Sequence, residues 1–235
     1  MERKTAKLAA IQGYDVALHY RSNEASAKKL CDEVCKLGAK ANTFQADISS
    51  EAQVVALFDC VQTTFGRFDA LVNNAGAITP LGKLVDMDKK RIQKVFDINV
   101  LGNFLCAREA VKIMSTENGG DGGAIVNVSS IASRIGSPNE FIDYAATKGA
   151  IDTFTIGLSK EVAAEGIRVN AVRPGLIATE IHAHTGDSER AERLRPAIPM
   201  QRVGGPEEVA PSIMWLLSDE ARYVTGALIG VSGGR

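Results

Sequence analysis

Long apolar runs and an excess of charge of either sign are both missing from this sequence. Its 235 residues contain 27 Lys and Arg against 28 Asp and Glu, which gives a net charge of -1. Because a basic surface is the electrostatic footprint of nucleic-acid and anionic-membrane binding, we expect neither partner. No stretch approaches the ~20 apolar residues of a membrane-spanning helix, and no secretory leader pattern is present, so a cytoplasmic protein is expected.

Cysteine is also scarce, and its spacing matches no common motif. The four cysteines, Cys31, Cys35, Cys60 and Cys106, include no C-x-x-C pair and lie in segments of helical character. They are therefore interpreted as reduced structural thiols. Cys31 and Cys35 share a helical face that could hold a metal ion, but no cluster of His or carboxylate side chains accompanies them, so no metal site is predicted.

What the sequence does contain is a repeated alternation of strand and helix patterns. Strands are predicted in YDVALHY, TFQADIS, FDALVNNAG, AIVNVSS, IRVNAVRPG and ALIGVSGG. Helices are predicted in KLAAIQG, EAQVVALFDCVQTTFG and PEEVAPSIMWLLS, and within residues 21–40, 88–118 and 144–165. Such alternation requires right-handed crossovers and a mostly parallel sheet. The predicted fold class is therefore α/β, a doubly wound (Rossmann-type) sheet with helices on both faces, in three layers.

The chain is predicted to form a single domain over residues 1–235. Its length suits one well-buried core, and no linker, repeat or low-complexity segment interrupts it. The strand FDALVNNAG is apolar without alternation, which is typical of a strand buried on both faces. The one long irregular stretch, Leu176–Arg202, is expected to close over a substrate, because loops of that length in compact domains are usually functional or mobile. His182 and His184 lie in this polar loop and are interpreted as solvated.

The residues that follow the predicted strands are the candidates for chemistry, since ligands of open parallel sheets bind beyond the carboxyl ends of the strands. The segment NNAG (Asn73–Gly76) leaves a buried strand through a turn of small residues. Such a turn either lets the backbone approach a flat ligand closely or is only a tight connection. The segment alone does not decide between the two.

The segment SSIASRIGSPNEFIDYAATK is more informative. It places Ser129 and Ser130 at a strand end and brings Tyr144 and Lys148 onto one helical face. A lone Tyr-x-x-x-Lys pair is usually a solvated helix surface. Together, however, these residues suit proton transfer: an ammonium near a phenol favours the phenolate and lowers its pKa, and a serine hydroxyl can hold the oxygen that the phenol protonates.

At this point a family resemblance is evident. The segments NNAG, FDINVLGNF with Asn99, VNVSS, YAATK and RPG occur in the order typical of the short-chain dehydrogenase/reductase family, single-domain branch, and the match runs from about Gly13 to the C-terminus. The chain resembles bacterial glucose-dehydrogenase-like and uncharacterised oxidoreductase members. The resemblance implies an NAD(P)-dependent enzyme that interconverts an alcohol and a carbonyl of a small molecule by hydride transfer.

The resemblance also implies roles for individual residues. Tyr144 would be the general acid/base, Lys148 would lower its pKa and hold the nicotinamide ribose, and Ser130 would bind the reacting oxygen. Asn99 would bend its helix so that a water can link Lys148 to solvent. The spacing between Ser130 and Tyr144 is one residue longer than usual, which is expected to enlarge the loop between them.

Further residues would contact the cofactor by the same resemblance. Asp47 and Ile48 correspond to the adenine contacts; Asn73, Ala75 and Gly76 to the ribose and strand-end contacts; and Pro174, Gly175, Ile177 and Thr179 to the nicotinamide side. NAD-specific relatives end the second strand with an acid that binds the ribose hydroxyls. Here the corresponding residues are Tyr20, Arg21 and Ser22, which repel no phosphate and could bind one, so NADP is preferred over NAD.

One expected feature is missing, the glycine-rich turn that receives the pyrophosphate. KTA (Lys4–Ala6) could begin the first strand and KLAAIQG could finish the first helix, which leaves roughly 12 to 18 residues absent between Ala6 and Lys7. The segment GGDGG cannot substitute, because it follows a helix and precedes a strand. Either the protein possesses a loop that this sequence omits, or the chain carries a true deletion. Omission is favoured, because deleting a central strand would cost far more than a single core substitution.

Two further expectations follow from the resemblance. A non-catalytic or cofactor-deficient member of the same fold, acting as a binding or regulatory module, is the alternative function, and the missing loop favours it. The family is commonly tetrameric, so a homotetramer, or a homodimer, is expected. The long helices over Asp88–Asn118 and Tyr144–Glu165 would pack between its subunits.

Overall fold

The computed structural model describes residues 1–178 and 190–235, except for the side chain of Ala191. Its strands are β1 (Val16–Tyr20), β2 (Ala41–Gln45), β3 (Ala70–Asn73), β4 (Gly123–Val128), β5 (Ile167–Pro174) and β6 (Leu228–Val231). Its α-helices are α1 (Glu2–Ile11), α2 (Glu24–Cys35), α3 (Glu51–Phe65), α4 (Lys89–Phe96), α5 (Gly102–Met114), α6 (Ala132–Ile135), α7 (Ile142–Glu161), α8 (Arg190–Leu194) and α9 (Pro206–Leu217). Within this described part, no helix is both long and apolar enough to cross a membrane.

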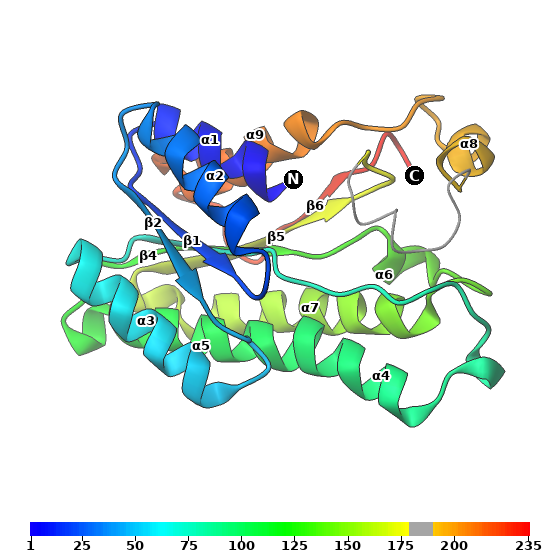
Figure 1. The fold of residues 1–235 in the computed structure, drawn as a ribbon, viewed down its shortest axis with the longest axis horizontal. Coiled ribbons are helices and arrows are strands. Elements are labelled where there is room, and N and C mark those ends of the chain that lie inside the picture. Colours follow the sequence, from blue (N-terminus) through cyan, green and yellow to red (C-terminus); the bar gives the residue numbers. More distant parts are fainter. Residues whose placement is uncertain (179–189) are drawn as a thin grey trace.

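The predicted α/β class is confirmed. Strands β3, β4, β5 and β6 pair in that order, β1 pairs with β2, and every one of these pairings is parallel. Helices α1, α2 and α9 lie on one side of the strands and α3, α5 and α7 on the other, so the chain forms three layers (Figure 1). All six strands, β1 included, overlap the segments predicted from the sequence. They could be predicted because each is a short apolar run bounded by turn residues.

The core is divided between the two faces of the four-stranded sheet. On one face, Ile125 and Val169 pack with Phe58 of α3 and Ala107 of α5. On the other face, α9 covers Val126 and neighbouring residues of β4 and β5. The predicted helix over residues 88–118 consists of α4, a π-helical segment (Asp97–Leu101) and α5, which follow one another without a loop.

The strands do not form one continuous sheet. Within the described residues, β1 pairs only with β2, and β3 pairs only with β4. Residues of β1 and β3 both line one cavity of about 2240 Å³, so each strand leaves an edge towards it. The two faces of β3 are covered as predicted, since Leu71 packs against the core on one face and Ala70 and Val72 against the core on the other, but its burial is incomplete. Three of its four residues are only partly buried, whereas almost all of β4 is buried, because β4 has a partner strand on each side and β3 has one.

The prediction of a first strand in Lys4–Ala6 is also wrong. These residues lie inside α1, which continues without interruption through Ala6 and Lys7. The backbone N–H groups of Lys4 and Thr5 both donate to the carbonyl of Met1, which starts the helix. Ala6 and Ala10 are buried against Leu18 of β1 and residues of α2, and this packing gives the helix its apolar face.

Core packing predicts the effect of a truncation in the central strand. Ile125 of β4 has no exposed surface, so Ile125→Ala should lower the free energy of unfolding by about 2–5 kcal/mol through lost burial and the cavity that remains. The measurement is urea unfolding followed by circular dichroism. Ile11→Ala is the matched control, because Ile11 is 66% exposed at the end of α1, and should change stability by less than about 0.5 kcal/mol. Equal effects of the two substitutions would contradict this packing.

Candidate active site

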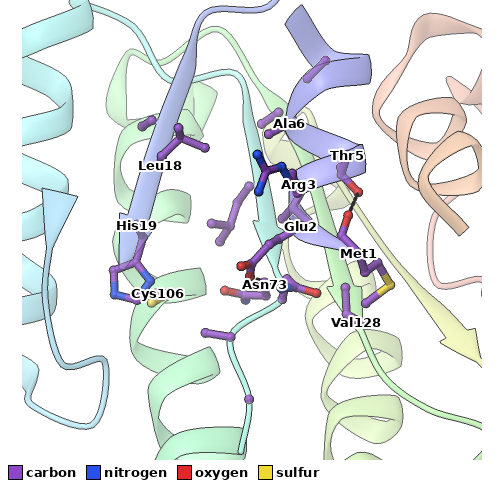
Figure 2. A pocket seen from close by; sticks show the side chains of 18 of the residues that line it. Met1, Glu2, Arg3, Thr5, Ala6, Leu18, His19, Asn73, Cys106 and Val128 are labelled. Atoms are coloured by element: carbon purple, nitrogen blue, oxygen red, sulfur yellow. Dashed lines mark hydrogen bonds between the residues drawn. The ribbon is translucent and has the colours of Figure 1, made fainter. Parts of the chain in front are cut away.

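The cavity extends along the gap between β1 and β3, from Tyr14 and Asp69 at their amino ends to the carboxyl ends of the strands. It collects almost all of the predicted site residues. Its walls include Tyr20, Arg21, Ser22, Asp47, Ile48, Asn73, Ala75, Gly76, Ser130, Tyr144, Lys148, Pro174, Gly175 and Ile177. Figure 2 shows one part of it, where Leu18 and His19 of β1 lie across from Asn73 of β3, with the first turn of α1 beside them. Thr179, His182 and His184 lie outside the described residues. Asn99 does not line the cavity but lies behind its wall.

Helix α7 positions two of the predicted catalytic residues. Tyr144 lies in its first turn and Lys148 one turn later, so both point from the same side of the helix. The Lys148 Nζ donates to the carbonyl of Val128 at 2.7 Å, and it lies 5.6 Å from the centre of the Tyr144 ring. The loop after β4 brings Ser130 close enough to Tyr144 for its hydroxyl to lower the pKa of the phenol. A phenol, a hydroxyl and an ammonium therefore meet at the end of β4.

Burial controls the protonation of both α7 side chains. It lowers the pKa of Lys148 to about 8, against an opposing effect from the carboxylate of Asp152. It raises the pKa of Tyr144, and this effect outweighs the hydrogen bond from Ser130 and the positive charge of Arg190, which both lower it. The expected lowering of the Tyr144 pKa by Lys148 is therefore not found. The physical reason is that the ammonium is bonded to the Val128 carbonyl and is not held at the phenol oxygen.

Asn99 lies in the π-helical segment between α4 and α5 and is fully buried. Its Oδ1 accepts from the Ala77 N–H at 2.6 Å, and its Nδ2 donates to the Ala77 carbonyl at 2.9 Å and to Thr147 Oγ1 at 3.2 Å. A β-carbon at Gly76 would lie 3.4 Å from Asn99 Oδ1 and 3.7 Å from Lys148 Nζ. Asn99 thus joins the turn after β3 to α7 immediately behind Lys148. π-Helical turns of this kind are frequent at functional sites.

Sequence reasoning missed a buried chain of amides that joins the strands to α7. Asn73 Nδ2 donates to Asn127 Oδ1 at 3.0 Å, and Asn127 Nδ2 donates to Thr155 Oγ1 at 2.9 Å. Asn103 of α5 donates to the Asn99 carbonyl at 2.9 Å and accepts from Asn73 through its own carbonyl. The signal in the sequence is the polar residue in the middle of the apolar strand AIVNV. A buried amide there requires partners, which are now visible.

The adenosine end of the predicted cofactor site lies at the ends of β1 and β2. Arg21 Nε is 3.9 Å from Asp47 Oδ2, and the Arg21 side chain is 55% exposed. The other carboxylate oxygen of Asp47 accepts from the N–H and the hydroxyl of Ser49, which lowers the pKa of this carboxyl. The Arg21 guanidinium keeps donors free for an anionic group, since a single contact at 3.9 Å does not engage its planar fork.

The opposite end of the site lies at Gly76, Lys148 and Gly175. A β-carbon at Gly175 would lie 2.7 Å from the Cα of Ser232, so only glycine fits there. The first turn of α1 lies between the two ends, and its Glu2 carboxylate accepts from Asn74 Nδ2 at 3.2 Å. The residues at both ends therefore fit a dinucleotide such as NAD(P), with a cation at one end and a narrow glycine-walled slot at the other.

The substrate side of the cavity is bordered by α8 and by the loop before α7. Arg190 Nη2 is 2.8 Å from Glu140 Oε2, and Arg193 contacts the other carboxylate oxygen at 3.2 Å. These ion pairs hold the start of α8 against the residues that precede Tyr144.

The four cysteines are free thiols, and the described residues contain no group of three or more His, Cys, Asp or Glu side chains that could hold a metal ion.

Comparison with known proteins gives consistent matches over nearly the whole chain. Residues 2–235 match a family model described as enoyl-(acyl carrier protein) reductase. The chain is 54% identical to the uncharacterized oxidoreductase YgfF of Escherichia coli, covering 99% of this chain and 94% of that protein. It is 38% identical to glucose 1-dehydrogenase 2 of Bacillus subtilis, covering 94% and 84%. Its structure superimposes on acetoin dehydrogenase from Enterobacter cloacae with a TM-score of 0.87 at 34% identity, covering 99% and 89%.

The burial of Lys148 predicts a pH-dependent cost to stability. Its pKa is about 8 in the folded protein and the ordinary value is 10.5, so between these values the unfolded chain keeps a proton that the folded chain releases. The free energy of unfolding should therefore rise over this range by about 3 kcal/mol from this group. Lys148→Met should be more stable than the parent at pH 7, and its advantage should shrink by that amount above pH 10.

The measurement is urea unfolding of both proteins from pH 7 to pH 10.5. Lys160→Met is the matched control, because Lys160 is exposed on the same helix. Its stability relative to the parent should not change across this range. A difference between Lys148→Met and the parent that is independent of pH would contradict the assigned cause.

Proposed function

Since the chain belongs to the short-chain dehydrogenase/reductase family, we propose that it is an NADP(H)-dependent oxidoreductase that interconverts an alcohol and a carbonyl, with Tyr144 as the general acid/base. The observation that carries this proposal is that Ser130, Tyr144 and Lys148, the last one turn beyond Tyr144 on α7, all line one cavity. The proposed substrate is a small-molecule alcohol or carbonyl, by analogy with the similar glucose 1-dehydrogenase 2 and acetoin dehydrogenase.

Bound NADP(H) would donate or accept the hydride, and the residues of this chain would manage the proton. In the direction of reduction, Ser130 holds the carbonyl oxygen by a hydrogen bond and Tyr144 gives that oxygen its proton. The raised pKa of Tyr144 keeps the phenol protonated at neutral pH, so it is available as an acid. Lys148, one turn further along α7, would then supply the proton that returns the phenol to its starting form. Oxidation runs through the same groups in reverse.

The cofactor would be held by residues at the ends of successive strands. Arg21 and Ser22 would bind the 2′-phosphate of NADP, with Tyr20 beside them. Asp47 and Ile48 would contact the adenine, and Asn73, Ala75 and Gly76 would contact the ribose and the strand ends. Lys148 would hold the nicotinamide ribose, and the nicotinamide would lie against Pro174, Gly175 and Ile177, with Thr179 assigned to the same group. NADP is proposed over NAD because no carboxylate occupies the end of β1.

The segment Leu176–Arg202 is proposed to close the substrate side of the site. Leu176 and Ile177 are buried, and the ion pair of Arg190 with Glu140 attaches α8 to the loop before Tyr144.

Asn99 is proposed to serve a water-linked route between Lys148 and solvent, since it connects the turn after β3 to α7 behind the ammonium.

A homotetramer is proposed, with α4, α5 and α7 between subunits. Phe104 of α5 stacks on Phe154 of α7 with ring centres 3.8 Å apart and is still 43% exposed. Leu101 and Ile156 are also exposed, at 46% and 39%. Exposed apolar side chains gathered on two neighbouring helices are typical of a subunit interface.

A cofactor-deficient binding or regulatory module is the second candidate. It is favoured by the separation of β1 from β3 and by the lack of a glycine-rich turn among the described residues. The two candidates differ in whether the chain binds a dinucleotide at all and, if it does, whether turnover depends on Tyr144.

Removal of the Tyr144 hydroxyl tests the proton step. Tyr144→Phe removes the proton and little volume, so it should keep NADPH binding within a few-fold and lower kcat by at least ~100-fold. The measurement is NADPH oxidation with a panel of small carbonyl compounds. Tyr223→Phe is the control, because Tyr223 is fully exposed, and should retain activity. Activity of Tyr144→Phe within a few-fold of the parent would place the proton elsewhere.

Reversal of the charge at Arg21 tests the cofactor preference. Arg21→Asp should change the ratio of the dissociation constants of NADPH and NADH by ~10-fold or more in favour of NADH, since a charge-assisted contact to the phosphate becomes a repulsion. The measurement is fluorescence titration with each cofactor. Arg222→Asp makes the same charge change at an exposed site and should leave the ratio as it was. An unchanged ratio in Arg21→Asp would refute the assigned contact.

A further inference from the structure

A buried ion pair lies one helical turn beyond Lys148. Asp152 of α7 accepts through its Oδ2 from Arg173 Nε at 3.1 Å and from Arg173 Nη2 at 2.9 Å. The Asp152 side chain is 10% exposed and that of Arg173 is 17% exposed. The other carboxylate oxygen of Asp152 is buried and has no hydrogen-bond partner among the described residues. A buried carboxylate oxygen without a donor is costly and calls for an explanation.

The backbone places this pair next to the atoms that hold Lys148. Lys148 donates to the carbonyl of Val128, at the end of β4. Val128 is the register partner of Val172 on β5, and Arg173 is the next residue of that strand. Asp152 follows Lys148 by one turn on the same side of α7. The space between α7 and β5 therefore contains two buried cations, Lys148 and Arg173, and one buried anion, Asp152.

Only part of the Asp152 charge is neutralised by Arg173. Both donors of the guanidinium reach the same oxygen, Oδ2, and leave Oδ1 without a hydrogen bond. In a buried setting such an unscreened charge acts strongly on a neighbouring ammonium. The effect of Asp152 on Lys148 is accordingly to raise its pKa, against the lowering by burial.

We propose that Asp152, held in place by Arg173, is a positioning residue that keeps Lys148 in its ammonium form in the site. This inference deepens the proposed function and rests on it, because the ammonium is the form that acts there. Asp152 lies outside the segments that carry the family resemblance, whereas Arg173 is the first residue of the RPG segment. Both residues act through Lys148. Asp152 sets the upper end of the pH range in which the site operates.

The other charged groups around α7 do not fill this role. On α7 itself, Tyr144 lies under the ammonium and is held protonated. From α4, Arg91 reaches α7 but pairs with Asp143 at 2.9 Å, at the start of the helix. From α6, Arg134 is exposed, and from the substrate side Arg190 pairs with Glu140. β4 and the π-helical segment present neutral groups to Lys148, the Val128 carbonyl and the Asn99 amide.

The test measures the pKa of Lys148 directly, in the free protein, by NMR titration of lysine labelled with ¹³C. The Lys148 signal is assigned by its loss in Lys148→Met. Asp152→Asn removes the charge and keeps the shape, and should lower the pKa of Lys148 by about one unit. Asp152→Glu restores the charge and should bring the pKa back towards that of the parent. Glu109→Gln is the matched control on α5, where a carboxylate of 9% exposure pairs with Arg108 and Lys112, and should not move it.

A double variant covers the possibility that Asp152→Asn leaves Arg173 buried without a partner and fails to fold. Asp152→Asn with Arg173→Met removes both charges, so the pKa of Lys148 should still fall, by less than in the single variant. In activity assays the alkaline limb of kcat/KM should move to lower pH by the same amounts. An unchanged pKa in the double variant, or in a folded Asp152→Asn, would overturn the inference. A shifted pKa in a protein that turns over no substrate would support the inference and count against the proposed function.

Discussion

Hydrogen bonds of buried asparagine side chains fix the strands, the turn after β3 and α7 relative to one another in this site. Asn73 of β3, Asn127 of β4 and Thr155 of α7 form one unbroken series, and Asn99 ties the turn after β3 to Thr147 of the same helix. Each group is buried, so the loss of one partner would leave an unsatisfied donor or acceptor in the core. Because the series crosses from strand to strand and then to α7, the position of Tyr144 and Lys148 depends on it more than on any surface contact.

The same burial decides the charge state of the site. Taking Lys148 and Tyr144 out of water favours the neutral form of each, which lowers one pKa and raises the other. Neighbouring groups act against this effect of burial. Asp152 raises the pKa of Lys148, and Ser130 and Arg190 lower the pKa of Tyr144. The free protein therefore presents a protonated phenol beside a lysine whose pKa is close to the working pH. That combination is suited to proton transfer, since Lys148, with a pKa of about 8, can exchange a proton near neutral pH.

Much of the fold could be predicted from sequence, and the exceptions have physical causes. The strands YDVALHY and AIVNVSS and the helices around them were recognisable because period and turn residues agree. Lys4–Ala6 were assigned to a strand from the expected order of elements, whereas their alanine-rich context and the packing of Ala6 and Ala10 on β1 and α2 favour a helix. The cleft residues were found because they follow strands. The amide series and the pair of Asp152 with Arg173 were missed, because partners distant in sequence leave no periodic signal.

We propose that the cavity between β1 and β3, which Arg21 and Lys148 both line, receives a dinucleotide with its adenosine end at Arg21 and its nicotinamide end at Lys148. The most direct measurement is the fluorescence of NADPH and of NADH during titration with the purified chain. The account predicts a saturable change with both cofactors and a lower dissociation constant for NADPH. No change in the fluorescence of either cofactor at saturating protein would contradict it, and would leave a folded scaffold that keeps the proton-transfer residues without a cofactor to serve.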